Sequence, residues 1–92
     1  MALLTLSSAS DVQNQLSKTI QKKRKAMKLS RDELALRSTV PTSTIKRFET
    51  TGQISLRQFI LLWQSVDDLT ALIGLTKEQP TAPKTIEEVL RT

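Results

Sequence analysis

Residues 29–49 read LSRDELALRSTVPTSTIKRFE and contain two short helical patterns separated by three residues. The first pattern begins at Ser30, whose hydroxyl can cap the amide of Glu33 while the Glu33 carboxylate caps the amide of Ser30. The second follows Pro41, whose fixed φ suits the first turn of a helix. The connection over residues 39–41 is too short for the two helices to lie antiparallel, so it predicts a helix-turn-helix corner.

The second of these helices is expected to have one apolar and one cationic side. At about 100° per residue, Ile45 and Phe48 face inward with Thr44 beside them. The outward side is formed by four polar or cationic residues, namely Thr42, Ser43, Lys46 and Arg47. Hydroxyls and arginine suit a helix in the major groove of DNA, where they reach base edges and phosphates. The same pattern also fits an ordinary solvated face of a helical bundle.

Over the whole chain, the sequence predicts five short helices and a compact all-α fold. They cover about Ser10 to Met27, about Arg31 to Ser38, and the segments that follow Pro41, Ser55 and Asp67 or Asp68. The first helix carries apolar residues at helical spacing, namely Val12, Leu16, Ile20 and Met27. Further capping boxes are expected at Ser55 with Gln58 and at Thr85 with Glu88, and a weaker one at Ser8 with Asp11.

Composition argues for one domain and against most catalytic chemistry. The chain has 92 residues, 38% of them apolar, with no cysteine and no histidine. This excludes disulfides, thiolate nucleophiles and imidazole bases, and leaves no ordinary zinc site. The adjacent acids are expected to be helix caps or first-turn charges. The sequence therefore predicts a protein that is not an enzyme and needs no cofactor.

Positive charge is concentrated in the first two thirds of the chain. The net charge is +5 and the isoelectric point about 10.0. Residues 18–57 hold eleven basic and three acidic side chains, a local charge of +8, whereas residues 58–92 have a charge of −2. Such a balance favours an anionic partner, nucleic acid first. With no signal peptide and no run of ~20 apolar residues, a cytoplasmic, nucleoid-associated location and no membrane partner are expected.

The sequence resembles the Cro/cI-type, or Xre-type, helix-turn-helix DNA-binding family over roughly residues 16–69. The resemblance lies in four motifs, which are L-x3-I-x3-R at 16–24, LSRDELA at 29–35, VPTSTIKRFE at 40–49 and ISLRQF at 54–59. It implies a lambda-repressor-like five-helix domain at 11–75, whose third helix enters the major groove. Residues 1–10 are then an N-terminal extension, and 76–92 a linker with a short amphipathic segment.

The resemblance also assigns individual residues. The positions expected to contact DNA are Arg31, Thr42, Ser43, Lys46, Arg47, Thr50, Thr51 and Arg57. Arg47 is the first candidate for a base contact, and Thr50 and Thr51 match a loop along the DNA backbone. Arg24 and Glu49 match a buried ion pair between the first and third helices. Three departures are Thr39 and Lys28, where the family often has glycine, and Lys23, where it is often apolar.

The helix after Ser55 has more apolar residues than one buried stripe needs. Its expected core residues are Leu56, Phe59, Leu62, Trp63 and Val66. Ile60 and Leu61 then point elsewhere, and with Trp63 they form a candidate dimer or partner surface. The alternative is that the fifth helix or the N-terminal leucines cover them.

These observations predict a sequence-specific double-stranded DNA-binding regulator of transcription, acting as a homodimeric repressor on a near-palindromic operator. The chain is also similar to antitoxins of the HipB type, which implies a cognate toxin as a further partner. The alternative is a helical protein-interaction or RNA-binding module whose basic face binds an acidic partner. Sequence discrimination at fixed salt separates the two, since any phosphate binding is salt-sensitive.

Overall fold

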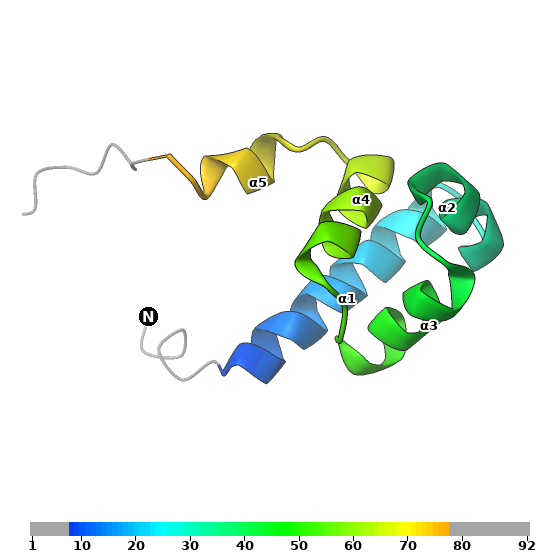
Figure 1. The fold of residues 1–92 in the computed structure, drawn as a ribbon, viewed down its shortest axis with the longest axis horizontal. Coiled ribbons are helices and arrows are strands. Elements are labelled where there is room, and N and C mark those ends of the chain that lie inside the picture. Colours follow the sequence, from blue (N-terminus) through cyan, green and yellow to red (C-terminus); the bar gives the residue numbers. More distant parts are fainter. Residues whose placement is uncertain (1–7, 78–92) are drawn as a thin grey trace, which may run out of the picture.

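A computed structural model describes residues 8–77, and this part of the chain is all-helical, without strands. It contains α1 (Ala9–Ala26), α2 (Arg31–Ser38), α3 (Thr42–Thr51), α4 (Leu56–Val66) and α5 (Thr70–Gly74). Figure 1 shows the long α1 passing behind α4, α2 and α3 meeting at a corner, and α5 leading away from the other four. The predicted all-α class with five helices is confirmed.

Local capping explains where the helices begin. At α2, Glu33 N donates to Ser30 Oγ (3.0 Å) and Ser30 N donates to the Glu33 carboxylate (2.8 Å). The pair Ser8 and Asp11 forms the same reciprocal box at α1, although the sequence ranked it as weaker. It starts α1 at Ala9, one residue earlier than predicted, so α1 overlaps the expected N-terminal extension.

The other two predicted capping boxes, at Ser55 and at Thr85, have different outcomes. At α4, Gln58 N donates to Ser55 Oγ (3.2 Å), but the Gln58 side chain accepts from that hydroxyl instead of reaching the Ser55 amide. Only half of this box is therefore formed. The box at Thr85 and Glu88 lies outside the described residues, as do the N-terminal leucines and most of the predicted linker and C-terminal segment.

The core lies where α1, α2, α3 and α4 meet. Its buried apolar residues are Ile20, Leu34, Val40, Ile45, Phe48, Phe59 and Leu62. Phe48 and Phe59 meet edge to face with their ring centroids 5.9 Å apart, a favoured aromatic geometry. The inward side predicted for α3 is therefore confirmed for Ile45 and Phe48, whereas Thr44 is only half-buried.

The predicted apolar side of α1 is buried only in its middle part, and one predicted core residue of α4 is wrong. Val12 is 46% and Met27 41% exposed, because the buried side of α1 runs through Ser17, Ile20 and Arg24 and neither end of the helix reaches the core. Leu56 is 74% exposed. As the first residue of α4, its side chain points back past the helix start and away from the packed layer.

The turn between α2 and α3 contains a left-handed residue that is not glycine. Thr39 has φ +64°, and its amide donates to Ala35 O at 2.9 Å. The turn therefore has the conformation that glycine usually provides, despite the threonine. Pro41 is the residue before the first helical one, with φ −57° and ψ 144°, so α3 follows Pro41 as predicted. Lys28 likewise has a positive φ, 58°, after α1.

We expect Thr39→Gly to raise the free energy of unfolding by about 0.5–1 kcal/mol, because glycine removes the left-handed strain but gains freedom in the unfolded chain. Thermal melts followed by circular dichroism measure this. Arg37→Gly is the matched control, exposed within α2 itself, and should be destabilising by about 1 kcal/mol. A lower melting temperature for Thr39→Gly would contradict the strain argument.

The link between α4 and α5 is tied to α1 through Trp63. The indole Nε1 donates to Asp68 O (2.7 Å), its ring lies 6.0 Å from Phe59, and Lys23 Nζ lies 5.5 Å above it. Lys23 also pairs with Asp67 at 2.8 Å. These contacts hold Trp63 within the domain, where it is half-buried like Ile60 and Leu61. In the described part of the chain, every helix is too short or too polar to cross a bilayer.

Candidate nucleic-acid interface

The outward side of α3 is polar, cationic and exposed. The exposed members are Ser43, Lys46, Arg47, Thr50 and Thr51, while Thr42 is half-buried. Glu49 is the one acidic residue of α3 and is buried on its inward side. A negatively charged ligand that approaches this face therefore meets cations and hydroxyls of α3, with no carboxylate of α3 against it.

The hydroxyls of this face are held in different ways. Thr42 Oγ1 donates to Asp32 Oδ1 (2.9 Å), which links the first turns of α3 and α2. Thr50 and Thr51 donate to the carbonyls of Lys46 (2.9 Å) and Arg47 (2.6 Å). Both residues belong to the last turn of α3, so their predicted place in a loop is wrong; the loop begins at Gly52.

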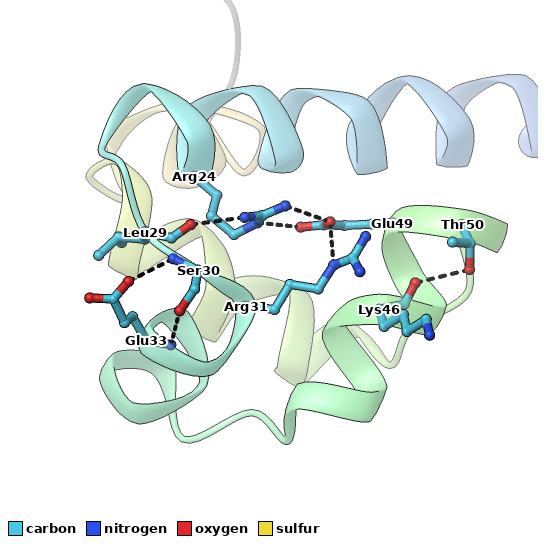
Figure 2. A network of polar contacts seen from close by, with 8 residues as sticks. All are labelled: Arg24, Leu29, Ser30, Arg31, Glu33, Lys46, Glu49 and Thr50. Carbon is cyan, nitrogen blue, oxygen red and sulfur yellow. Dashed lines mark hydrogen bonds and ion pairs between the residues drawn. The ribbon is translucent and has the colours of Figure 1, made fainter.

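Behind this face, one buried carboxylate accepts hydrogen bonds from two arginines (Figure 2). Arg24 donates to Glu49 through Nε (2.8 Å) and Nη2 (3.0 Å), and its Nη1 donates to Leu29 O (2.8 Å). Arg31 Nε donates to the same carboxylate at 2.9 Å. The Arg24–Glu49 pair expected from the resemblance is therefore present, and it joins α1 to α3.

Arg31 has a second role that the sequence did not reveal. Its position at the start of α2 suggested a DNA phosphate contact, but its Nε is engaged with Glu49. Its side chain is 32% exposed, and it lines a shallow polar hollow between α1, α2 and α3 together with Lys25 and Thr42. Arg31 thus fixes α2 against α3 while its side chain stays partly exposed.

The surroundings of Glu49 keep it ionised. Burial raises the pKa of a carboxyl group, but the hydrogen bonds and charges of Arg24 and Arg31 outweigh burial, so the pKa of Glu49 lies below its ordinary value of 4.5. In the part of the chain that the structure describes, no buried side-chain nitrogen or oxygen lacks a hydrogen-bond partner. The network is therefore complete, with two positive charges against one negative charge.

This lowered pKa predicts how stability depends on pH. The folded state binds a proton at Glu49 less readily than the unfolded state, so the contribution of Glu49 is complete above the unfolded pKa. It is lost as the pH falls from about 4.5 through the lower folded pKa. Denaturant midpoints from about pH 7 down to about pH 3 should fall more steeply in the parent than in Glu49→Gln. Parallel curves would contradict the prediction.

The remaining predicted residues lie on α4, at a separate surface. Arg57 is exposed, and it lines a mostly apolar hollow with Leu56, Ile60 and Leu61. Ile60 and Leu61 are half-buried, and Leu61 packs against the core. The exposed apolar residue beside the hollow is Leu56, which the sequence analysis assigned to the core.

Gln53 is a site residue that sequence reasoning missed. Its Oε1 accepts from Arg47 Nη2 at 2.8 Å, which places a neutral side chain from the α3–α4 loop against the main candidate for base contact. No sequence signal distinguished this glutamine from the other glutamines. Within residues 8–77, no group of three potential metal ligands is found.

No family model, curated protein or solved structure matches this chain. The geometry described above is therefore the basis for assigning a function.

Proposed function

We propose that this chain is a sequence-specific double-stranded DNA-binding regulator of transcription, of the Cro/cI type that its sequence resembles, with α3 in the major groove. The observation that carries the proposal is the outward face of α3, which presents Ser43, Lys46 and Arg47 without an acidic neighbour on that helix. A helix of this size fits the major groove of B-form DNA.

Rigid support of α3 favours recognition of base edges over a diffuse electrostatic contact. Ile45 and Phe48 are buried on the inward side, and Glu49 ties α3 to both α1 and α2. Side chains on an anchored helix are held in fixed positions relative to one another, which base readout requires. A merely basic surface needs no such anchoring.

The exposed residues divide into two kinds of contact. We assign base contacts to Arg47 and Ser43, because arginine can bridge the O6 and N7 atoms of guanine and a hydroxyl can bond to any base. Phosphate contacts are assigned to Lys46, Thr42, Thr50, Thr51, Arg57 and the exposed part of Arg31, which orient the protein without reading sequence. Of these residues, Lys46 lies on α3 and Arg31 at the start of α2, whereas Arg57 supplies a positive charge from the separate surface of α4.

A homodimer that acts as a repressor is part of the proposal, and its surface is the hollow on α4. Leu56 is exposed beside Ile60 and Leu61, so two copies can bury their leucines against each other's hollows. A cognate toxin, which the resemblance to antitoxins of the HipB type implies, is the further partner in this proposal.

Leu56→Glu should abolish self-association while leaving the helical circular dichroism unchanged, because the side chain is exposed and outside the core. Light scattering measures the mass. Leu36→Glu is the matched control, since Leu36 is 84% exposed on α2 and lies away from the hollow. Leu61→Glu is unsuitable because Leu61 packs against the core. An unchanged mass for Leu56→Glu would exclude this surface.

Amide chemical-shift mapping with a DNA duplex tests the placement of α3. The expected result is that the largest changes occur in residues 42–53 and at the start of α2, with α5 unaffected. A double-stranded RNA of equal length serves as the competitor of equal charge and should not displace the DNA. Shifts spread over the lysines of α1, or equal competition by RNA, would favour the alternative of a general basic surface.

A further inference from the structure

A closed set of three hydrogen bonds links Arg47, in the middle of α3, to the loop that follows the helix. Arg47 Nη2 donates to Gln53 Oε1 (2.8 Å), and Gln53 N donates to Thr51 Oγ1 (3.1 Å). Thr51 Oγ1 in turn donates to Arg47 O (2.6 Å). The set begins at the guanidinium of Arg47 and ends at its own backbone carbonyl, so it restrains the side chain relative to its helix.

Gly52 places Gln53 within reach of Arg47. Gly52 has φ +80°, a left-handed conformation that turns the chain back along α3. A Cβ at this position would lie 3.1–3.2 Å from atoms of Asn14 and Gln13 on α1, so the turn is packed tightly against α1. The position of Gln53 is therefore fixed by the fold.

We infer that Gln53 is a positioning residue that sets the base preference of Arg47. The inference rests on the proposed function and extends it to a residue outside the outward face of α3. The amide oxygen of Gln53 holds one nitrogen of the guanidinium without cancelling its charge. A guanidinium has five N–H donors in a rigid fork, so the remaining donors can still bridge a guanine.

Because the amide of Gln53 is neutral, it can position the guanidinium of Arg47 without neutralising its charge. A carboxylate at position 53 would hold the guanidinium more strongly but would also repel DNA phosphates and offset the positive charge. A neutral acceptor orders the side chain before binding and leaves the charge available. Ordering one flexible side chain in advance is expected to raise affinity about 2- to 10-fold.

Gln53→Met tests the inference, because methionine keeps the length of the side chain and removes the acceptor. Binding is measured by fluorescence anisotropy with two duplexes. One is the preferred duplex, and the other is altered at the base pair for which Arg47→Ala relaxes the preference. Gln53→Met should lower affinity for the preferred duplex about 2- to 10-fold and leave the altered duplex unchanged. Combined with Arg47→Ala, it should cause no further loss. Gln64→Met, an exposed glutamine of α4, is the control and should change neither affinity.

The variant Gln53→Glu separates the effect of the acceptor's position from the effect of its charge. Gln53→Glu keeps an acceptor at the same place, so it should weaken binding to both duplexes but preserve the ratio between them. Additive losses with Arg47→Ala, an equal loss on both duplexes in Gln53→Met, or a gain in affinity would overturn the inference. If the parent protein binds all duplexes equally, the proposed function fails and the inference fails with it. A selective parent with an unaffected Gln53→Met variant overturns the inference alone.

Discussion

Replacing Glu49 with alanine is expected to lower the free energy of unfolding by about 3–5 kcal/mol, since it leaves a buried charge without its partner. Two guanidinium groups lose their common acceptor, and Arg24, buried between α1 and α3, cannot turn to solvent. A domain of this size has about 5–10 kcal/mol of stability in total, so the variant should be close to unfolding. Denaturant titration followed by circular dichroism measures the difference.

Two further variants test whether the unpaired buried charge causes the loss of stability in Glu49→Ala. Asp67→Asn removes the carboxylate of a pair whose side chains are 34% and 37% exposed, and it should be destabilising by no more than about 1 kcal/mol. The double variant Arg24→Met and Glu49→Met replaces the buried pair with apolar groups and should recover much of the stability lost in Glu49→Ala. A loss below about 1 kcal/mol for Glu49→Ala would show that the network behaves as a surface ion pair.

Replacing Arg47 with alanine is expected to weaken binding to the preferred duplex by about 1–3 kcal/mol, or roughly 5- to 150-fold, and to relax preference at one base pair of each half-site. The reason is that Arg47 is the arginine of α3 and is exposed, and only one of its donors is engaged, with Gln53. Its loss should leave non-specific binding nearly unchanged apart from one charge.

Lys46→Ala supplies the comparison with a phosphate contact on the same helix. It should weaken all duplexes alike and reduce the slope of log K against log salt by about 0.9. Arg37→Ala is the control for charge alone, since Arg37 is exposed at the far end of α2. If Arg47→Ala weakens all duplexes equally, Arg47 is a phosphate contact and the base-reading role belongs elsewhere.

Local sequence signals predicted the corner between α2 and α3 well. The capping box at Ser30 marks the first residue of α2, and Pro41 marks the residue before α3, because both act on the backbone next to them. The inward residues of α3 also followed from helical spacing. The Arg24–Glu49 pair came from the resemblance, and its geometry is present in the structure.

Long-range contacts account for what the sequence did not predict. The approach of Arg31 to Glu49 depends on how α2 packs against α3, which spacing along the chain does not show. The contact between Arg47 and Gln53 depends on the turn at Gly52. The exposure of Leu56 likewise depends on its place as the first residue of α4, so helical periodicity alone assigned that residue to the core.

Selection of bound duplexes from a random pool at physiological salt shows whether α3 reads DNA sequence in a dimer. We expect one enriched motif in two inverted copies whose centres lie about one helical turn apart, and we expect this motif to be absent when the Arg47→Ala variant is used for the selection. Tight, salt-sensitive binding without an enriched motif would contradict it and leave only an electrostatic surface.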